Sequence, residues 1–223
     1  MFGWIKRIIM WFIQTVIMPH TLFYVPNKNK VALSIDDSPR NSTNEILDIL
    51  DEYNVKATFF IIGENANERP NTVREILRRG HEIGNHTIVD EASFRNTPEE
   101  FRNHVLRTKE IIDNFTEEPT KLFRPGSGIT LNWMYPILEE LGYKITIENK
   151  DYYAISTSSH AFDVNVPRSW VNGFCSWFIN DTTKGGDIID IHDRNFTTTE
   201  LRKVIEHLQN KGCEICKISD IIN

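Results

Sequence analysis

Cysteine is scarce in this chain, which has only three in 223 residues. An odd and sparse set provides no disulfide framework of the kind that stabilises small secreted domains. Cys213 and Cys216 have the spacing of a zinc-binding pair, but no second cysteine or histidine pair lies nearby to complete four ligands. Both residues also lie in a predicted strand, where positions three apart face opposite sides. We therefore expect them to be structural.

The chain also lacks internal repeats, low-complexity tracts and an excess of basic charge. Lysine and arginine total 25 against 31 aspartates and glutamates, which gives a net charge of −6 at pH 7. This balance argues against a protein that binds nucleic acid through bulk positive charge. The composition, 40% hydrophobic and 25% charged, is that of a globular protein and excludes a disordered or collagen-like chain.

The chain has no long uninterrupted apolar run. The longest, at residues 8–18, is interrupted by Gln14 and is shorter than the ~20 residues that a spanning helix needs, unless the helix extends past Pro19 and His20. Residues 1–30 carry a charge of +4 and residues 31–223 a charge of −10. Three interpretations of residues 1–30 stay open, namely an uncleaved signal anchor, a helix docked on the domain and a cleaved signal peptide. Membrane association would involve residues 4–24, and we expect a membrane-anchored or secreted protein rather than an intracellular one.

From residue 31 onward, short apolar segments alternate with segments of helical periodicity. Strands are predicted at 31–35, 57–63, 81–85, 122–124, 143–147, 187–193 and 213–218. Helices are predicted at 43–54, 71–79, 97–114, 132–141, 170–180 and 199–211, the third of which opens with a capping box at Thr97 and Glu100. Repeated strand–helix units predict an α/β domain with a parallel sheet, either open or closed into a barrel.

Polar side chains occur where several of these strands end. They are Asp36, Asp37, His86, Arg124, His192 and Asp193. Each alone could be a cap, a turn residue or a buried histidine with its hydrogen bonds satisfied. Because the functional groups of α/β proteins collect at the carboxyl ends of the strands, their joint placement indicates an active site.

A divalent metal ion could bind among these residues. If the segment from His86 to Asp90 forms a helical turn, both side chains point to one side. Together with Asp37 they would supply one imidazole and two carboxylates, with positions left open for water and substrate. Asp36 would then be a base beside the metal-bound water, and His192 could serve as the general acid.

Four motifs in the chain resemble those of the polysaccharide deacetylases, carbohydrate esterase family four, which share the NodB-homology domain. They are SIDDSP at 34–39, GHEIGNHT at 80–87, FRPGSG at 123–128 and DIHD at 190–193. The resemblance runs from about Val31 to Ile222. It implies a single catalytic domain at residues 31–223, folded as a distorted (β/α) barrel of about seven or eight parallel strands.

The resemblance also implies a role for each matching residue. The base would be Asp36, held and tuned by Arg124, and the acid that protonates the leaving amine would be His192. Asp37 and His86 would bind one divalent ion, expected to be zinc, manganese or cobalt. The reaction would be hydrolysis of an N-acetyl group, with the oxyanion bound by the metal and a backbone N–H.

Two further sets of residues follow from the family pattern. The turn of Gly126, Ser127 and Gly128 would bind the substrate, since glycine allows close approach to the backbone. An aspartate polarises the catalytic histidine in this family. The segment that supplies it is degraded here, so that Asp163 is the first candidate and Asp151 the second.

The chain departs from the family pattern at three positions. Asp90 stands where a second metal-binding histidine is usual, which would make the site harder and more negative and favour manganese, magnesium or iron over zinc. Asp190 stands where a leucine usually lines the pocket for the acetyl methyl group. Period two along the strand places it on the same face as His192, where it could pair with that histidine or join the metal. Val164 replaces a usual tryptophan.

We therefore expect a metal-dependent hydrolase that removes N-acetyl groups from an N-acetylglucosamine polysaccharide such as chitin and releases acetate. Its partner would be an N-acetylated glycan and not a nucleic acid. A non-catalytic relative that binds glycans through a degraded metal site is one alternative. A hydrolase of small amides that are not sugars is another.

Overall fold

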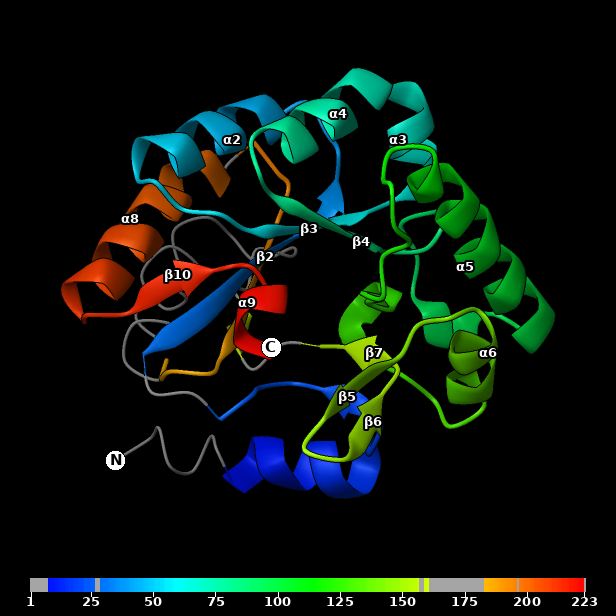
Figure 1. The fold of residues 1–223 in the computed structure, drawn as a ribbon. Helices are drawn as coiled ribbons and strands as arrows, with labels where there is room; N and C mark the ends of the chain where they lie inside the picture. Colours follow the sequence, from blue (N-terminus) through cyan, green and yellow to red (C-terminus); the bar gives the residue numbers. More distant parts are fainter. Residues whose placement is uncertain (1–7, 27–28, 157–158, 161–182, 196, 223) are drawn as a thin grey trace.

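The computed structural model describes residues 8–26, 29–156, 159–160, 183–195 and 197–222 (Figure 1). Within these residues the central sheet has six parallel strands, with neighbours in the order β4, β3, β2, β9 and β8, while β10 pairs with the start of β2. The strands are β2 (Lys30–Ser38), β3 (Thr58–Ile61), β4 (Glu82–Asn85), β8 (Ser159–His160), β9 (Ile188–His192) and β10 (Glu214–Cys216). The predicted α/β class with a parallel sheet is confirmed.

Helices surround this sheet on the outside (Figure 1). They include α2 (Thr43–Glu52), α3 (Gly63–Glu68), α4 (Pro70–Arg78), α5 (Pro98–Asp113), α6 (Met134–Glu140), α8 (Thr197–Asn210) and α9 (Ser219–Ile222). The predicted capping box is present at the start of α5, where the Thr97 hydroxyl accepts a hydrogen bond from the Glu100 amide and the Glu100 carboxylate accepts one from the Thr97 amide. The cap satisfies two backbone N–H groups that the helix cannot, which explains why α5 begins there.

The main hydrophobic core lies between the sheet and the helices α2, α4 and α8. Strand β2 contributes Leu33 and Ile35 to this core. Helix α2 contributes the apolar side chains of its predicted buried face, and all of these side chains are fully buried. Burial of each such aliphatic side chain contributes about 1.5 to 3 kcal/mol. This packing holds β2 rigidly in the middle of the sheet, so its carboxyl end is a firm base for a site.

Two predicted strands lie outside the parallel sheet. Residues 145–147 form β5 (Ile145–Ile147), which pairs antiparallel with β6 (Lys150–Tyr152). The reason is the two-residue turn between them, where Glu148 and Asn149 both have positive φ, 48° and 64°, as a tight hairpin requires. The segment at 122–124 makes only an isolated bridge from Phe123 to Asn85, and the predicted helix at 170–180 lies outside the described residues.

The start of the described chain is helical from residue 8 to 17, including η1 (Ile13–Ile17), and lies beside the β5–β6 hairpin (Figure 1). Gln14 connects it to the domain, because its side-chain oxygen accepts a hydrogen bond from the Phe23 amide at 2.8 Å and its nitrogen donates to the Tyr152 hydroxyl at 3.4 Å. The strand that follows, β1 (Thr21–Leu22), pairs with β7 (Ala154–Ile155). No helix in the described part of the chain combines the length and the apolar character needed to cross a bilayer.

Candidate active site

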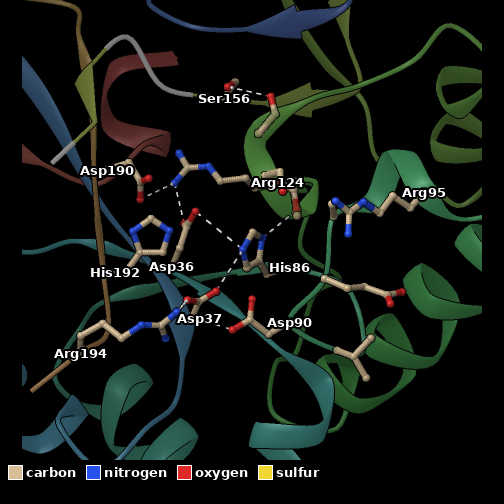
Figure 2. A pocket seen from close by; sticks show the side chains of 16 residues that line it. Asp36, Asp37, His86, Asp90, Arg95, Arg124, Ser156, Asp190, His192 and Arg194 are labelled. Carbon is tan, nitrogen blue, oxygen red and sulfur yellow. Dashed lines mark hydrogen bonds and ion pairs between the residues drawn. The ribbon is translucent and has the colours of Figure 1, made fainter. Parts of the chain in front are cut away.

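A cavity of about 600 Å³ opens at the carboxyl ends of β2, β4 and β9 (Figure 2). It is lined by Asp36, Asp37, His86, Val89, Asp90, Glu91, Ala92, Arg95, Arg124, Gly126, Ser127, Gly128, Ser156, Asp190, His192 and Arg194. Among the described residues, the cavity contains every residue predicted for catalysis, metal binding or substrate binding except the candidate Asp151. Asp163 lies outside the described residues, and Asp151 lies away from the cavity in β6, paired with Lys144 at 2.7 Å.

Asp36 sits near the end of β2 and is almost fully buried. Its Oδ1 accepts a hydrogen bond from Nη1 of Arg124 at 2.6 Å, and the same guanidinium nitrogen contacts Oδ1 of Asp190 at 3.2 Å and Oγ of Ser34 at 2.7 Å. The guanidinium also packs over the ring of Phe60, 4.1 Å from its centroid. Loss of water around the buried carboxyl raises the pKa of Asp36, and the Asp190 charge adds to this, against the opposing effect of Arg124.

His86 directly follows β4, and a hydrogen bond to the backbone of Arg124 fixes the orientation of its ring. Its Nδ1 is 2.9 Å from the carbonyl oxygen of Arg124, so the proton on Nδ1 points there and Nε2 faces the cavity. Nε2 lies 3.5 Å from Oδ1 of Asp37 and 3.7 Å from Oδ2 of Asp36. Burial lowers the pKa of His86, but the two carboxylates outweigh it and the net pKa is raised.

The predicted helical turn between His86 and Asp90 does not form, so this prediction is wrong. Residues 88–90 form a bend, and Thr87 has a φ of 69°. The cause is the side chain of Asn85, whose Oδ1 accepts a hydrogen bond from the Thr87 amide at 2.8 Å and holds the backbone in this left-handed conformation. His86 and Asp90 therefore do not project from adjacent positions on one helical face.

Two arginines that the motifs did not mark, Arg40 and Arg194, contact the acidic residues of the site, and Arg194 is drawn in Figure 2. Arg194 lies 2.5 Å from Oδ2 of Asp37 and 3.5 Å from Oδ2 of Asp90, and Arg40 lies 2.7 Å from the same oxygen of Asp90. Burial would raise the pKa of Asp37, but the hydrogen bond and charge of His86, with Arg194, hold it well below its usual range. The Asp90 side chain is 54% exposed and is drawn toward these cations. The sequence offered only one sign that these arginines belong to the site, namely that they lie close to motif residues. Arg194 comes two residues after His192, and Arg40 comes directly after Pro39.

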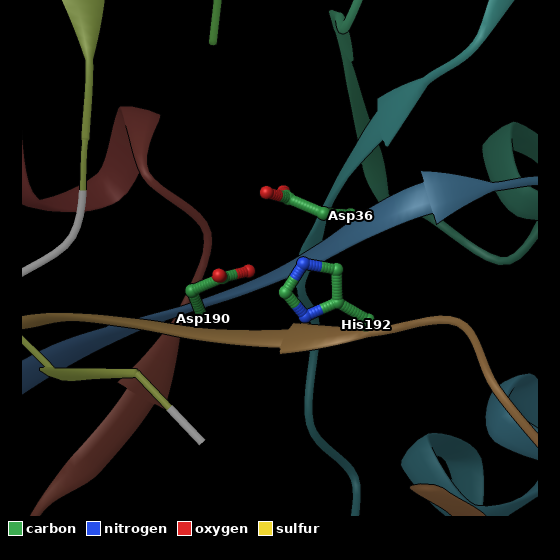
Figure 3. Close-up of side chains that lie close together, drawn as sticks. All are labelled: Asp36, Asp190 and His192. Atoms are coloured by element: carbon green, nitrogen blue, oxygen red, sulfur yellow. The ribbon is translucent and has the colours of Figure 1, made fainter. Parts of the chain in front are cut away.

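His192 and Asp190 project from β9 into the same space as Asp36 (Figure 3). In the sheet His192 is opposite Asp36 and Asp190 is opposite Ser34, and one potential ligand atom from each of Asp36, Asp190 and His192 lies within 4.8 Å of the others. The predicted shared face of Asp190 and His192 is thus present. Among the described residues, these three form the group whose atoms are close enough to hold a cation together.

Asp193, the last of the polar residues at strand ends, is structural. Its buried carboxylate accepts hydrogen bonds from the hydroxyls of Ser38, Ser42 and Thr43, at 3.0, 2.6 and 2.5 Å, and from the Arg40 amide at 3.1 Å. Charge-assisted bonds of this kind are stronger than neutral ones. They tie the loop after β2 to the end of β9 and so fix Asp36 relative to His192.

The turn at residues 126–128 forms one wall of the cavity. The Gly126 amide donates to the Ser93 hydroxyl at 2.8 Å, and a Cβ added at Gly126 would lie 1.8 Å from the Glu91 carbonyl oxygen, so only glycine fits. The Gly128 amide donates to the Pro125 carbonyl at 2.9 Å. Ser127, with a φ of 68°, has its amide engaged in no hydrogen bond within the described part of the chain. This turn therefore offers one backbone donor to a ligand.

The donor atoms present fit a divalent cation in part. Nε2 of His86 and Oδ1 of Asp37 converge, and the hydrogen bond from Nδ1 of His86 to a carbonyl is the arrangement that orients metal-binding histidines. Asp90 does not converge with His86 and Asp37, because its carboxylate is paired with Arg40 and Arg194. An imidazole and carboxylates are ligands for zinc, manganese or cobalt alike, so the set favours none of the three.

Comparison with known proteins identifies the family. A family model described as polysaccharide deacetylase matches residues 24–146. A peptidoglycan-N-acetylglucosamine deacetylase of Bacillus cereus is 31% identical over 207 residues, which cover 89% of this chain and 91% of that protein. The chain belongs to the polysaccharide deacetylase family, carbohydrate esterase family four, and has its distorted barrel in a single domain.

Solved structures show the same fold. That of the Bc1960 peptidoglycan N-acetylglucosamine deacetylase, bound to an N-hydroxybenzamide, is similar with a TM-score of 0.78 and 28% identity, over 95% of each chain. A mutant of a Bacillus anthracis pseudoenzyme of this family, with restored activity, is similar with a TM-score of 0.79 and 25% identity, over 92% of this chain and 72% of that one. The substrate in the names of the deacetylases is peptidoglycan, whereas the sequence motifs had suggested a chitin-like polymer.

Proposed function

We propose that this protein hydrolyses the N-acetyl group of N-acetylglucosamine in peptidoglycan and releases acetate. The observation that carries the proposal is the arrangement of Asp36, Arg124 and His192 around one cavity, with Asp37 and His86 beside them. The names of the relatives support peptidoglycan as the substrate in place of chitin. The reaction adds water across an amide, so the products are acetate and a free amine on the sugar.

The proton transfers fall to residues of this chain. Asp36 is buried with a raised pKa, which makes it a stronger base toward the attacking water than an exposed carboxylate would be. Arg124 fixes its orientation. The Ser127 amide supplies a hydrogen bond to the oxyanion that forms on the acetyl oxygen. His192 then protonates the nitrogen as the carbon–nitrogen bond breaks.

Asp37 and His86 would hold the divalent ion, with Asp90 as a further ligand once its arginine partners are displaced. Such an ion supplies polarisation of the acetyl carbonyl and a lower pKa for water. Asp190 would support His192, because it lies on the same strand and one of its oxygens is within 4.8 Å of a nitrogen of that ring. Asp163 stays a second proposal for this supporting role.

The test is release of acetate from purified peptidoglycan and from chitin oligosaccharides with added zinc, manganese or cobalt. We expect turnover on peptidoglycan, and a loss of more than about 100-fold in kcat for Asp36→Asn and for His192→Ala, the scale typical of general acid–base groups. Asp113→Asn, at the end of α5 and outside the cavity, is the matched control and should keep full activity. No acetate from any N-acetylated glycan with any of the metals would reject the proposal.

A second candidate function is glycan binding without turnover. It is favoured by one specific observation, that Arg40 and Arg194 neutralise the two acids Asp37 and Asp90 that should meet a metal. Similarity to a pseudoenzyme of the family shows that this fold also exists in an inactive form. Metal content by mass spectrometry separates the two. About one ion per chain, lost in Asp37→Ala, supports the hydrolase, and none after loading supports the binding protein.

We also propose that the helix at residues 8–17 lies flat on an anionic membrane surface. Ile8, Ile9, Trp11, Phe12, Val16 and Ile17 are each about half exposed, and they account for most of the large exposed apolar side chains of the described chain. The sequence places Lys6 and Arg7 directly before them, with no acid in the first 30 residues. An exposed apolar helix surface beside basic residues is typical of helices that bind anionic lipid interfaces.

Sedimentation with vesicles tests this location. We expect the chain to bind vesicles containing phosphatidylglycerol, and to bind pure phosphatidylcholine vesicles weakly. The double variant Trp11→Ser and Phe12→Ser should abolish binding, while Phe94→Ser, at an exposed apolar residue elsewhere, should not. Equal binding of the double variant, or a dimer in light scattering that the double variant breaks, would reject the membrane proposal.

A further inference from the structure

Three arginines line the cavity, and they differ in how their charge is used (Figure 2). Arg124 is buried and paired with Asp36 and Asp190. Arg194 is paired with Asp37 and Asp90. Arg95 has no carboxylate within ion-pair distance anywhere in the described part of the chain, so its charge is available to a ligand.

Glu91, one of the two acids that lie four residues from Arg95 along the chain, is already engaged elsewhere. The carboxylate of Glu91 accepts a hydrogen bond from the Asn96 side chain at 2.7 Å and lies 3.1 Å from Nδ1 of His104. Both contacts engage the Glu91 carboxylate with partners other than Arg95. The guanidinium of Arg95 instead lies 5.9 Å from the centroid of the Phe94 ring, a contact that orients the cation without neutralising it.

Arg95 is also held in place relative to the reacting groups. It ends the short helix η2 (Ser93–Arg95), which packs on η3 (Gly126–Gly128) through the hydrogen bond from the Gly126 amide to the Ser93 hydroxyl. In Figure 2 the side chain of Arg95 extends from η2 with its guanidinium toward the cavity, on the side opposite Arg194. A substrate whose acetyl group lies between Asp36 and His192 would therefore extend past Arg95 at the cavity rim.

We infer that Arg95 binds a carboxylate carried by the sugar next to the one that is deacetylated. The inference rests on the proposed function, because in peptidoglycan each N-acetylglucosamine is linked to muramic acid, whose lactyl group bears a carboxylate or an attached acidic peptide. A guanidinium pairs with a carboxylate through two parallel hydrogen bonds. Chitin has no such group, so Arg95 would distinguish the two polymers.

The experiment compares three oligosaccharides of equal length: a neutral chitin oligosaccharide, a glycan with free lactyl carboxylates, and the same glycan with its peptides attached. For Arg95→Ala we expect kcat/KM to fall about three- to tenfold on the acidic glycans and to stay unchanged on the neutral one. Arg95→Glu should show a larger loss with the same selectivity, because it places two like charges together. Arg107→Ala removes an exposed arginine of α5 that does not line the cavity, and it should change nothing.

The two acidic substrates show where the carboxylate resides. A loss confined to the glycan with free lactyl groups assigns it to the lactate, and a loss confined to the peptide-bearing glycan assigns it to the peptide. The preference for acidic glycans should also weaken as ionic strength rises, since the pair is exposed. An Arg95→Ala variant that loses the same activity on all three substrates, or on none, would overturn the inference.

Binding measured apart from turnover keeps this result separate from the proposed function. Fluorescence anisotropy of a labelled lactyl-bearing glycan should report weaker binding to Arg95→Ala than to the unaltered chain, even if neither releases acetate. In that case the proposed hydrolysis fails and the carboxylate subsite stands. Equal affinities of the two proteins for the acidic glycan, with turnover intact, would reject the subsite and leave the hydrolase.

Discussion

At the scale of single residues, the site is a set of buried charges that control one another. Asp36 and Asp190 share one nitrogen of Arg124, and His86 lies within 4 Å of both Asp36 and Asp37. A single charge removed from such a group changes the protonation of its neighbours, because burial weakens screening by water. The pKa of Asp36, raised by burial and by Asp190, is the clearest example.

Asp190→Asn should move the acidic limb of the pH–rate profile to lower pH. The substitution removes a negative charge that raises the pKa of Asp36, so the base stays deprotonated and active further into the acid range. The check is kcat/KM for acetate release as a function of pH. Asp220→Asn, on α9, is the control. An acidic limb that stays in place, or moves to higher pH, would show that Asp190 does not act on Asp36.

Arg194→Gln should strengthen the binding of a divalent metal by about five- to tenfold. The guanidinium lies 2.5 Å from Oδ2 of Asp37, so it competes with a cation for the same carboxylate and repels it. Titration calorimetry with manganese measures the effect. Arg202→Gln, which breaks a pair on the exposed face of α8, should leave the affinity unchanged. Weaker binding in Arg194→Gln would instead assign Arg194 to support of the site.

At the scale of elements, the site depends on two short turns that pack against each other. The η2 and η3 turns are joined by the Ser93–Gly126 hydrogen bond and by the close approach of the Gly126 backbone to the Glu91 carbonyl. One turn carries Arg95 and the other carries the free amide of Ser127. Their spacing therefore sets the shape of the cavity wall, which neither turn would hold alone.

Gly126→Ala should separate these turns. The added methyl group would lie 1.8 Å from a backbone oxygen, so one of the turns has to shift. We expect a loss of about 2 kcal/mol in the free energy of unfolding and more than about 100-fold in kcat. Gly142→Ala is a matched control, since its added methyl group meets no atom within 4 Å.

The control still carries a backbone cost. Gly142 has a φ of 88°, which costs an alanine about 1 kcal/mol. It should therefore lose stability but not activity. Denaturant titration and acetate release measure the two effects separately, and equal activity losses in the two variants would contradict the role of the Gly126 contact.

At the scale of the whole molecule, stability depends on pH through a histidine far from the site. His81 is buried, and its Nδ1 accepts a hydrogen bond from the Ala57 amide at 3.1 Å. Burial lowers the pKa of His81 to about 4, from the 6.5 of an exposed histidine. The unfolded chain therefore takes up a proton at a higher pH than the folded chain, so that the fold loses stability as pH falls from about 6.5 to 4.

His81→Asn should reduce this acid sensitivity. The asparagine oxygen can accept the Ala57 hydrogen bond, but it does not titrate. Between pH 7 and pH 5 we expect the unaltered chain to lose about 2 kcal/mol more in free energy of unfolding than the variant, from the size of the pKa difference. Urea titrations at the two pH values measure the difference. Identical losses in both proteins would mean that His81 does not set the acid limit.

The sequence alone predicted the parts of this protein that depend on local chemistry. Asp36, Asp37, His86, Arg124 and His192 were identified because each follows or ends an apolar strand, and strand ends meet in an α/β fold. The helices α2, α4 and α5 were predicted by apolar spacing and by the Thr97 cap, which are properties of neighbouring residues, whereas α3 was not predicted. Motif resemblance then identified the family, since four short motifs in order carry more information than any one element.

Only the tertiary structure decided how the distant charges are paired. That Arg40 and Arg194 hold Asp90 follows from contacts between residues far apart in the chain, which no local pattern encodes. Packing also brings His104 of α5 to the Glu91 carboxylate, whereas Arg95 meets no carboxylate within the described residues. The bend after His86, by contrast, depends on a local contact, the hydrogen bond that the Thr87 amide donates to Oδ1 of Asn85 two residues earlier. Local sequence determines which groups reach the cavity, whereas packing determines which of them remain available for chemistry, because a charge is neutralised by whatever lies within a few ångströms in space.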